Sequence, residues 1–352
     1  MVAELDVFEG DLAGTSVVEV EFSSERAARR FRPPSWFGRE LTGDRAWANQ
    51  SLAVAGLPDR KGEFRLRGGE DPGIGVARVI AARAAQASAA VRRADAATDP
   101  AADVHEARKS LKKIRSSLRL LRGTIPDQER KAANSSCREA AAGLAGARDA
   151  TVKIETLDGV APNLPGGSGG AAWRRDLERE ADGHRDDLTP DRLRRVTDLI
   201  EGVRIDFVGR DPGADPEQVA GNLGRSYRRG RRAMRRARKS ESAADLHAWR
   251  KRAKDLRYQL EILEPRLPEF ADMRRRAEEL ADKLGDLHDL DVLAGDLVGR
   301  GLGEAEAARL RESISEARER LLDHCLRLGE RTYRLKPGRF TNEIAESLGD
   351  AA

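Results

Sequence analysis

The pattern of apolar and polar positions changes character near residue 72. Before that point, "LDVFEG" and "SVVEVEF" alternate apolar with polar residues around a glycine-rich turn, which predicts two short strands. "SSERAARRF" opens with serine and has a glutamate shortly after, which predicts a short capped helix. "RGGEDPGIG" then indicates a linker. We therefore predict a small α+β segment over residues 1–72.

From Val76 onward the chain consists almost entirely of helix-forming residues. Proline- and glycine-rich breaks divide residues 73–332 into eight helical segments, and residues 336–352 are interpreted as a C-terminal tail. Uninterrupted apolar runs stay well below the roughly 18 residues that a membrane span requires, so we expect no membrane association.

Two blocks of sequence recur in the same order. "VHEARKSLKKIRSSLRLLR" begins at Val104, and "LHAWRKRAKDLRYQLEIL" begins 142 positions later at Leu246. Further along, "LAGARDATV" is matched by "LGDLHDLDV". The repeat predicts a mainly α fold made of two pseudo-symmetric four-helix bundles, with halves at about residues 73–208 and 214–335.

The repeated helix carries a basic stripe in each copy. On a helix turning about 100° per residue, the basic residues lie about a third of a turn from the apolar ones. The first stripe comprises His105, Arg108, Lys109, Lys112, Arg115 and Arg119, and the second comprises His247, Arg250, Lys251, Lys254 and Arg257. Like charges at i and i+4 destabilise a helix, so a bound polyanion would relieve the repulsion. An ordinary solvated face is the alternative.

The segment before the second copy, "RSYRRGRRAMRRARKS", is also strongly basic. Its helical periodicity places Arg228, Arg231 and Arg235 beside the apolar edge, where they could extend the anion-binding surface. The same periodicity points Arg229 and Arg236 outward, where they would serve solubility.

Composition supports an oxyanion partner. Apolar residues make up 39% of the 352 residues and aromatic residues 4%, as expected for an aliphatic helical bundle. The 64 basic residues include 11 lysines, and the arginines that make up the rest present rigid forks suited to phosphate oxygens. A coding bias toward arginine is the alternative. The net charge is only +4, so the local distribution of charge matters more than its sum.

Other chemistries lack a sequence signal. Cys137 and Cys325 are far apart and show no metal-ligand spacing, which predicts a reducing, cytoplasmic environment. The acidic start "MVAELDVFEGDLAG" does not resemble a signal peptide. We find no serine–histidine–aspartate arrangement, phosphate-binding glycine loop or metal-ligand group, and therefore expect no catalytic centre, metal or cofactor.

The repeated motifs resemble the CHAD domain family over residues 73–335. This resemblance implies two four-helix bundles around a pseudo-two-fold axis, with a basic surface and central channel that bind inorganic polyphosphate. It adds Arg148 and Tyr258 to the residues expected at the binding site. It also implies a location at polyphosphate granules in the cytoplasm.

The N-terminal segment resembles a different family. "LDVFEGDLAGTSVVEVEF" followed by "PPSWFGRELTGDRAWANQSLA" is similar to the C-terminal end of a CYTH domain, the triphosphate tunnel fold. Glu19 and Glu21 match acidic tunnel positions, but the ExExK signature and most barrel strands have no counterpart here. We expect a truncated, non-catalytic remnant.

These observations predict a non-enzymatic protein that binds inorganic polyphosphate. One alternative is a nucleic-acid-binding module, although the chain offers few aromatic residues for stacking on bases. The other alternative is a triphosphate-processing enzyme that uses Glu19 and Glu21.

Overall fold

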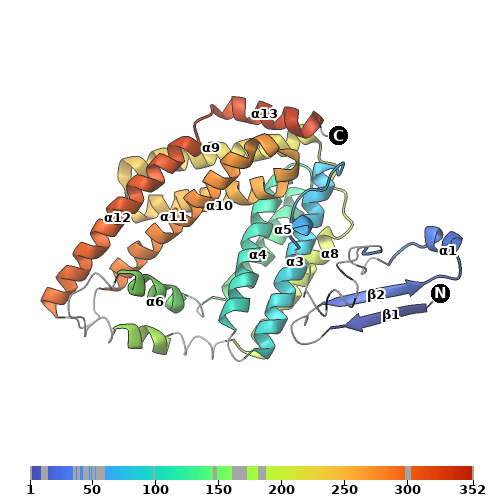
Figure 1. The fold of residues 1–352 in the computed structure, drawn as a ribbon, viewed down its shortest axis with the longest axis horizontal. Coiled ribbons are helices and arrows are strands. Elements are labelled where there is room, and N and C mark those ends of the chain that lie inside the picture. Colours follow the sequence, from blue (N-terminus) through green and yellow to red (C-terminus); the bar gives the residue numbers. More distant parts are fainter. Residues whose placement is uncertain are drawn as a thin grey trace.

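The computed structural model describes residues 2–8, 15–34, 37, 40–42, 47, 49, 52, 60–97, 100–145, 149–160, 173–180, 188–297 and 303–350. Over these residues the chain is mainly helical, with a small sheet near the N-terminus (Figure 1). The predicted fold class is therefore confirmed.

The N-terminal segment contains an antiparallel hairpin and a short helix. Strand β1 (Val2–Val7) pairs with β2 (Ser16–Glu21), so that Glu4 lies opposite Glu19. Helix α1 (Glu25–Arg30) starts where the Ser24 side chain accepts a hydrogen bond from the backbone N–H of Ala27. The short 3-10 helix η3 (Arg60–Phe64) then leads to the helical region.

The first bundle consists of α3 (Pro72–Ala96), α4 (Ala101–Leu120), α5 (Asp127–Gly143) and α8 (Pro190–Phe207). Helix α3 packs against α4 and α8, and α5 closes the ring by packing against the same two helices.

The second bundle repeats this arrangement with α9 (Pro216–Ser240), α10 (Ala243–Leu263), α11 (Ala271–Asp296) and α12 (Glu304–Thr332). Helix α10 packs against α9 and α11, and α12 packs against the same two helices. The 3-10 turns η5 (Glu264–Arg266) and η6 (Pro268–Phe270) join α10 to α11.

Equivalent helices begin in the same way. Asp71 caps α3 and Asp215 caps α9, each accepting backbone N–H bonds from the first turn, and a proline follows each cap. Positions in α9 therefore correspond to positions 144 residues earlier in α3. Positions in α10 correspond to positions 142 residues earlier in α4.

Three features differ from the sequence-based expectation. The first half contains a helix beyond the four expected in it, α6 (Asp149–Val160), and α6 packs against α11 of the other bundle. Residues 336–352, interpreted as a tail, contain helix α13 (Pro337–Asp350), which buries Phe340, Ile344 and Leu348 in the core beside α9. These three residues follow an i, i+4, i+8 spacing that is typical of a packed helix.

Helix α3 is the third difference. Among the described residues it is long and apolar enough to cross a membrane, whereas the sequence analysis found no such segment. Its apolar side chains pack against α4 and α8, as those of a core helix do.

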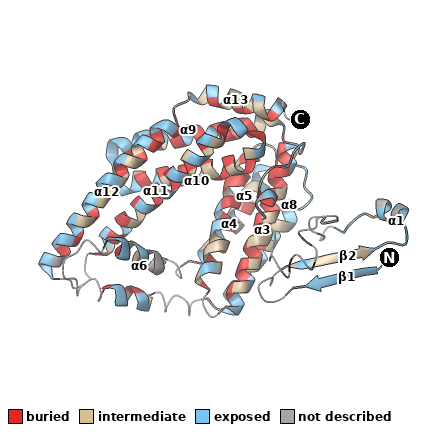
Figure 2. Cartoon of the chain, in the orientation of Figure 1, coloured by how far each residue is buried: buried red, intermediate tan, exposed pale blue. Residues whose placement is uncertain are grey.

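A single hydrophobic core runs through both bundles. Buried residues from α3 to α13 belong to one contiguous cluster, and Figure 2 shows them on the inward faces of the helices. A smaller cluster joins Leu157 of α6 with Trp173 and Leu177, and with Leu290 and Leu310 of the second bundle. The two halves therefore share packing and are not separate globules.

Candidate functional site

The two repeated helices lie against each other at the junction of the bundles. The buried Gln259 side chain of α10 donates from Nε2 to the backbone O of Ser116 on α4 over 2.9 Å. Ser116 Oγ donates in return to the backbone O of Asp255 over 3.0 Å. These bonds satisfy polar groups in the junction and fix the relative position of the two basic stripes.

Two ion pairs cross this junction at equivalent places. Lys113 of α4 meets Glu261 of α10 at 2.7 Å, and Arg119 of α4 meets Asp255 of α10 at 3.2 Å. Lys113 corresponds to Asp255 in the repeat, and Arg119 corresponds to Glu261. The same contact is therefore made twice with its charges reversed.

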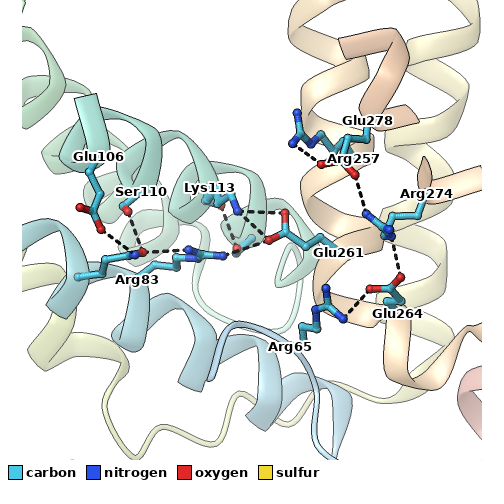
Figure 3. Close-up of polar contacts among 12 residues, drawn as sticks. Arg65, Arg83, Glu106, Ser110, Lys113, Arg257, Glu261, Glu264, Arg274 and Glu278 are labelled. Carbon is cyan, nitrogen blue, oxygen red and sulfur yellow. Dashed lines mark hydrogen bonds and ion pairs between the residues drawn. The ribbon is translucent and has the colours of Figure 1, made fainter. Parts of the chain in front are cut away.

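Figure 3 shows the network around the first of these pairs. Arg83 of α3 also reaches Glu261, at 3.2 Å. Burial lowers the pKa of Lys113 to about 8, and Arg83 adds to this effect while Glu261 opposes it. Burial acts to raise the pKa of Glu261, but Lys113 and Arg83 hold it below its usual value. This network stabilises the junction. Lys113 is buried and faces inward, so it does not belong to the basic stripe predicted from the sequence.

The two stripes meet at Lys112 and Lys254, which are equivalent positions of the repeat. Burial lowers the pKa of Lys254 to about 8, and the positive charges of Arg250 and Lys112 lower it further. The charge of Lys112 acts on Lys254 from the other helix, so the two stripes are close enough for their charges to interact. We call this pair of stripes the paired basic face and define it by Arg108, Lys109, Lys112, His247, Arg250, Lys251 and Lys254.

His247 lies at one end of the paired basic face and packs against His288 of α11, with ring centroids 4.4 Å apart and ring planes inclined at 38°. Burial lowers the pKa of His247 to about 4, and His288, Lys251, Arg250 and Lys254 contribute in the same direction. Its Nδ1 atom is buried without a hydrogen-bond partner among the described residues, as is Nε of Arg250. A bound anion would supply an acceptor here and would favour the protonated ring.

The predicted residues differ in their availability. Lys109, Lys112 and Lys251 are exposed, whereas His105, Arg108, His247, Arg250 and Lys254 are half-buried. The lysines and arginines among them can present positive charge to a ligand in solution.

Other predicted residues are engaged inside the protein. Arg257 contacts Glu278 at 2.5 Å and Asp282 at 2.7 Å, both on the neighbouring helix α11. Tyr258 is buried beneath Lys113, whose Nζ lies 5.4 Å from the ring centre. Arg257 and Tyr258 thus pack within the second bundle and do not extend the exposed face.

The first stripe also turns inward toward its C-terminal end. Nε of Arg115 donates to Oδ1 of Asn134 on α5 over 3.1 Å, and burial lowers the pKa of the Arg115 guanidinium. The side chain of Arg119, one turn further along α4, pairs with Asp255 of α10. Arg148 lies outside the described residues.

Helix α9 carries its arginines on more than one side. Arg228 and Arg235 are exposed and Arg231 is half-buried. Arg235 lines a shallow hollow with Arg232, Arg236 and Lys239, and Arg236 pairs there with Asp245 at 2.7 Å. Arg229, which the sequence analysis placed on an outward solubilising face, lines a cavity at the end of α4.

Arg130 on α5 and Arg122 on the turn after α4 also line this cavity. They were not predicted from the sequence because they belong to no helical stripe. Within the described part of the chain, no group of three or more His, Cys, Asp or Glu residues is placed to hold a metal ion.

Comparison with known proteins agrees with this architecture. The family model described as CHAD domain matches residues 78–298. The chain belongs to the CHAD domain family. The solved structure described as PptA from Streptomyces chartreusis superposes with a TM-score of 0.57 at 14% identity, covering 76% of this chain and 100% of that one. The CHAD domain from the plant Ricinus communis superposes with a TM-score of 0.51 at 18% identity, covering 82% of this chain and 96% of that one. Both likenesses concern the fold.

A curated relative is similar over a short stretch. The inorganic triphosphatase of Nitrosomonas europaea is 54% identical over 52 residues, which are 15% of this CHAD chain. The match spans about a third (34%) of the length of that relative.

Proposed function

We propose that this CHAD protein binds inorganic polyphosphate along the paired basic face and performs no chemistry on it. The observation that carries the proposal is the meeting of Lys112 and Lys254. Equivalent bases from both repeats converge there, although burial and repulsion lower the pKa of Lys254 to about 8. A phosphate chain lying across both helices would neutralise these charges.

The ligand class follows from what the face offers. It presents lysine and arginine charges along two helices, which suits a flexible chain of phosphates whose recognition is electrostatic. Tyr227, Trp249 and Tyr333 are buried, so these rings are not available to stack on nucleic-acid bases. Contacts with both repeats would also raise the effective concentration of the chain at the second one.

The test is titration of the full-length protein with labelled long-chain polyphosphate across a salt series. We expect saturable binding that weakens steeply with salt. Lys112→Glu combined with Lys254→Glu should lower the affinity by roughly 10–100-fold, because two attractive charges become repulsive. Arg309→Glu with Arg311→Glu, an exposed pair on α12, is the matched control and should change it less than about threefold.

Two results would overturn the proposal. One is that the Lys112/Lys254 variant binds polyphosphate as the parent does while remaining folded. The other is that single- or double-stranded DNA displaces polyphosphate at equal phosphate concentration, in which case the nucleic-acid alternative takes its place.

A triphosphate-processing activity is the second candidate, and the short similarity to an inorganic triphosphatase favours it. Its acidic residues would be Glu19 and Glu21, both exposed on strand β2. Phosphate release from tripolyphosphate with magnesium or manganese tests this candidate. Activity that disappears in the Glu19→Gln/Glu21→Gln variant would establish it and refute the non-catalytic part of our proposal.

A further inference from the structure

A cavity of about 230 Å³ lies where the end of α4 meets α9. It is lined by the arginines Arg119, Arg122, Arg130, Arg225 and Arg229, together with Asn222 and Ser226. Cavities that accept drug-sized molecules are larger, at roughly 300–1,000 Å³. The size therefore suits a small occupant.

The charge of the cavity is largely uncompensated. Arg119 has Asp255 as a partner at 3.2 Å, and Arg130 has Asp127 at 2.7 Å. Within the described part of the chain, no carboxylate lies at ion-pairing distance from Arg122, Arg225 or Arg229. Burial lowers the pKa of Arg119, and the nearby charge of Arg229 is among the bases that lower it further. Three guanidiniums are thus held together without an internal counter-charge.

Asn222 organises the cavity. Its buried side chain donates from Nδ2 to the backbone O of Leu120 over 2.8 Å and of Arg122 over 2.9 Å. Its Oδ1 accepts a bond from Nη1 of Arg225 over 3.0 Å. The first two bonds occupy carbonyl groups at the negative end of α4, and the third orients an arginine at the cavity.

The repeat shows that the fold does not require these arginines. Arg225 and Arg229 on α9 correspond to Ala81 and Ala85 on α3. Arg119 and Arg122 correspond to Glu261 and Glu264 in the second half. Favourable placement of bases near a helix C-terminus accounts for Arg119 and Arg122, but not for two arginines in the middle of α9.

We propose that this arginine cavity is a second anion site, separate from the paired basic face, that binds a compact phosphate group with several negative charges. Planar guanidiniums converging from α4, the following turn, α5 and α9 match the oxygen atoms of such a group. The group is either free pyrophosphate or the terminal phosphoryl unit of a polyphosphate chain. The second source rests on the proposed function, whereas the first does not.

Calorimetric titration of the full chain with pyrophosphate is the first arm of the test. We expect saturable binding that Arg225→Ala/Arg229→Ala weakens at least about tenfold, because two charge-assisted contacts are lost. Arg309→Ala/Arg311→Ala is the control, since it removes two arginine charges from exposed positions of α12 outside the cavity. It should change the affinity less than about twofold.

The second arm compares long-chain polyphosphate with the same chain blocked at both ends. If the cavity binds chain ends, the Arg225/Arg229 variant weakens binding of the free-ended chain and leaves the blocked chain unaffected. Equal binding of pyrophosphate and of both chains by parent and variant, with unchanged melting, would overturn the proposal.

The two proposals can fail independently. Lys112→Glu/Lys254→Glu should leave pyrophosphate binding intact, because those residues do not line the cavity. If that variant also leaves polyphosphate binding unchanged, the paired basic face is refuted while the arginine cavity stands.

Discussion

The end of α4 and the end of α10 occupy equivalent places in the repeat, but they differ in what covers them and in the charges around them. The end of α10 is covered by the segment that precedes α3. The backbone N–H of Leu66 donates to the O of Ile262 over 2.8 Å, and Arg65 pairs with Glu264 at 2.9 Å. The ring of Phe64 lies against the guanidinium of Arg83, 3.5 Å from its centroid. This end is closed and internally neutralised.

At the end of α4, Leu120 stands where Ile262 stands in the second copy, and its carbonyl is met by the Asn222 side chain. No segment equivalent to Phe64–Leu66 is among the residues that line this cavity, and among the described residues no carboxylate pairs with Arg122, Arg225 or Arg229 there. The comparison shows how one scaffold yields a structural junction and a candidate binding site. The difference lies in a covering segment and in the sign of a few charges.

Glu261→Gln should have the largest effect of the changes that test this comparison. It leaves Lys113 and Arg83, both buried, without their shared carboxylate, so we expect the free energy of unfolding to fall by about 3 kcal/mol. Arg119→Gln at the other end should cost only about 1 kcal/mol, because Asp255 keeps Arg252 as a partner at 3.1 Å. Urea denaturation of both variants measures the difference. Equal losses would contradict the contrast between a closed and an open end.

Leu66→Ala tests the cover over α10. Leu66 is buried in the core, so its truncation should lower the free energy of unfolding by about 2–3 kcal/mol. Val7→Ala, at an exposed strand position, is the control and should stay within about 0.5 kcal/mol of the parent. Opening this end should not create an anion site, because Glu261 and Glu264 line it. A gain of pyrophosphate binding in calorimetry would therefore argue against our account of the charges.

Asn222→Ala probes the open end. The carbonyl groups of Leu120 and Arg122 lose their donor, and we expect a loss of about 1–2 kcal/mol in thermal or urea unfolding. If the arginine cavity binds phosphate, pyrophosphate affinity should also fall severalfold, since Arg225 loses its orienting contact. Parent-like stability would show that water replaces the amide at no cost.

The dependence on pH should be the smallest effect. Polyphosphate affinity should decline severalfold as the pH rises through about 8, because Lys254 then loses its proton. Lys254→Arg should flatten this decline, since arginine stays charged. A binding curve with the same slope in both proteins would exclude Lys254 as the titrating group.

The same lysine affects stability in the opposite direction: a rise in pH should weaken polyphosphate binding but stabilise the ligand-free fold. Its pKa in the folded protein is about 8 against an ordinary value of 10.5, so the unfolded chain holds the proton more tightly. Its penalty on stability is full below pH 8 and is relieved as the pH rises toward 10.5. Lys254→Met should therefore raise the stability of the ligand-free protein near pH 7 by up to about 1 kcal/mol while weakening polyphosphate binding.

Much of the architecture was predictable because its signals are local. Short windows of sequence contain the helix caps, such as Asp71 and Asp215, as well as the apolar periodicity and the repeated basic motif. The packed helix at residues 337–350 was also within reach, since Phe340, Ile344 and Leu348 carry the helical spacing. The presence of a basic stripe on each repeated helix was also readable from the sequence.

The partners of the basic residues were not predictable in the same way. Glu278 and Asp282 reach Arg257 from another helix, and no window around Arg257 contains them. The arginine cavity draws on α4, a turn, α5 and α9, so its composition depends on tertiary packing. Helical periodicity gives the direction of Arg229 relative to its own helix, but the neighbour it faces is α4.

The reversed ion pairs have a consequence for how the two repeats recognise each other. Two copies of the first repeat, packed through the same contact, would set Lys113 against Arg119, base against base. Two copies of the second would set Asp255 against Glu261, acid against acid. In the native pairing each contact joins opposite charges, at 2.7 Å and 3.2 Å. The junction therefore discriminates against self-pairing of either half, and it would favour one first half with one second half even if the halves came from different molecules.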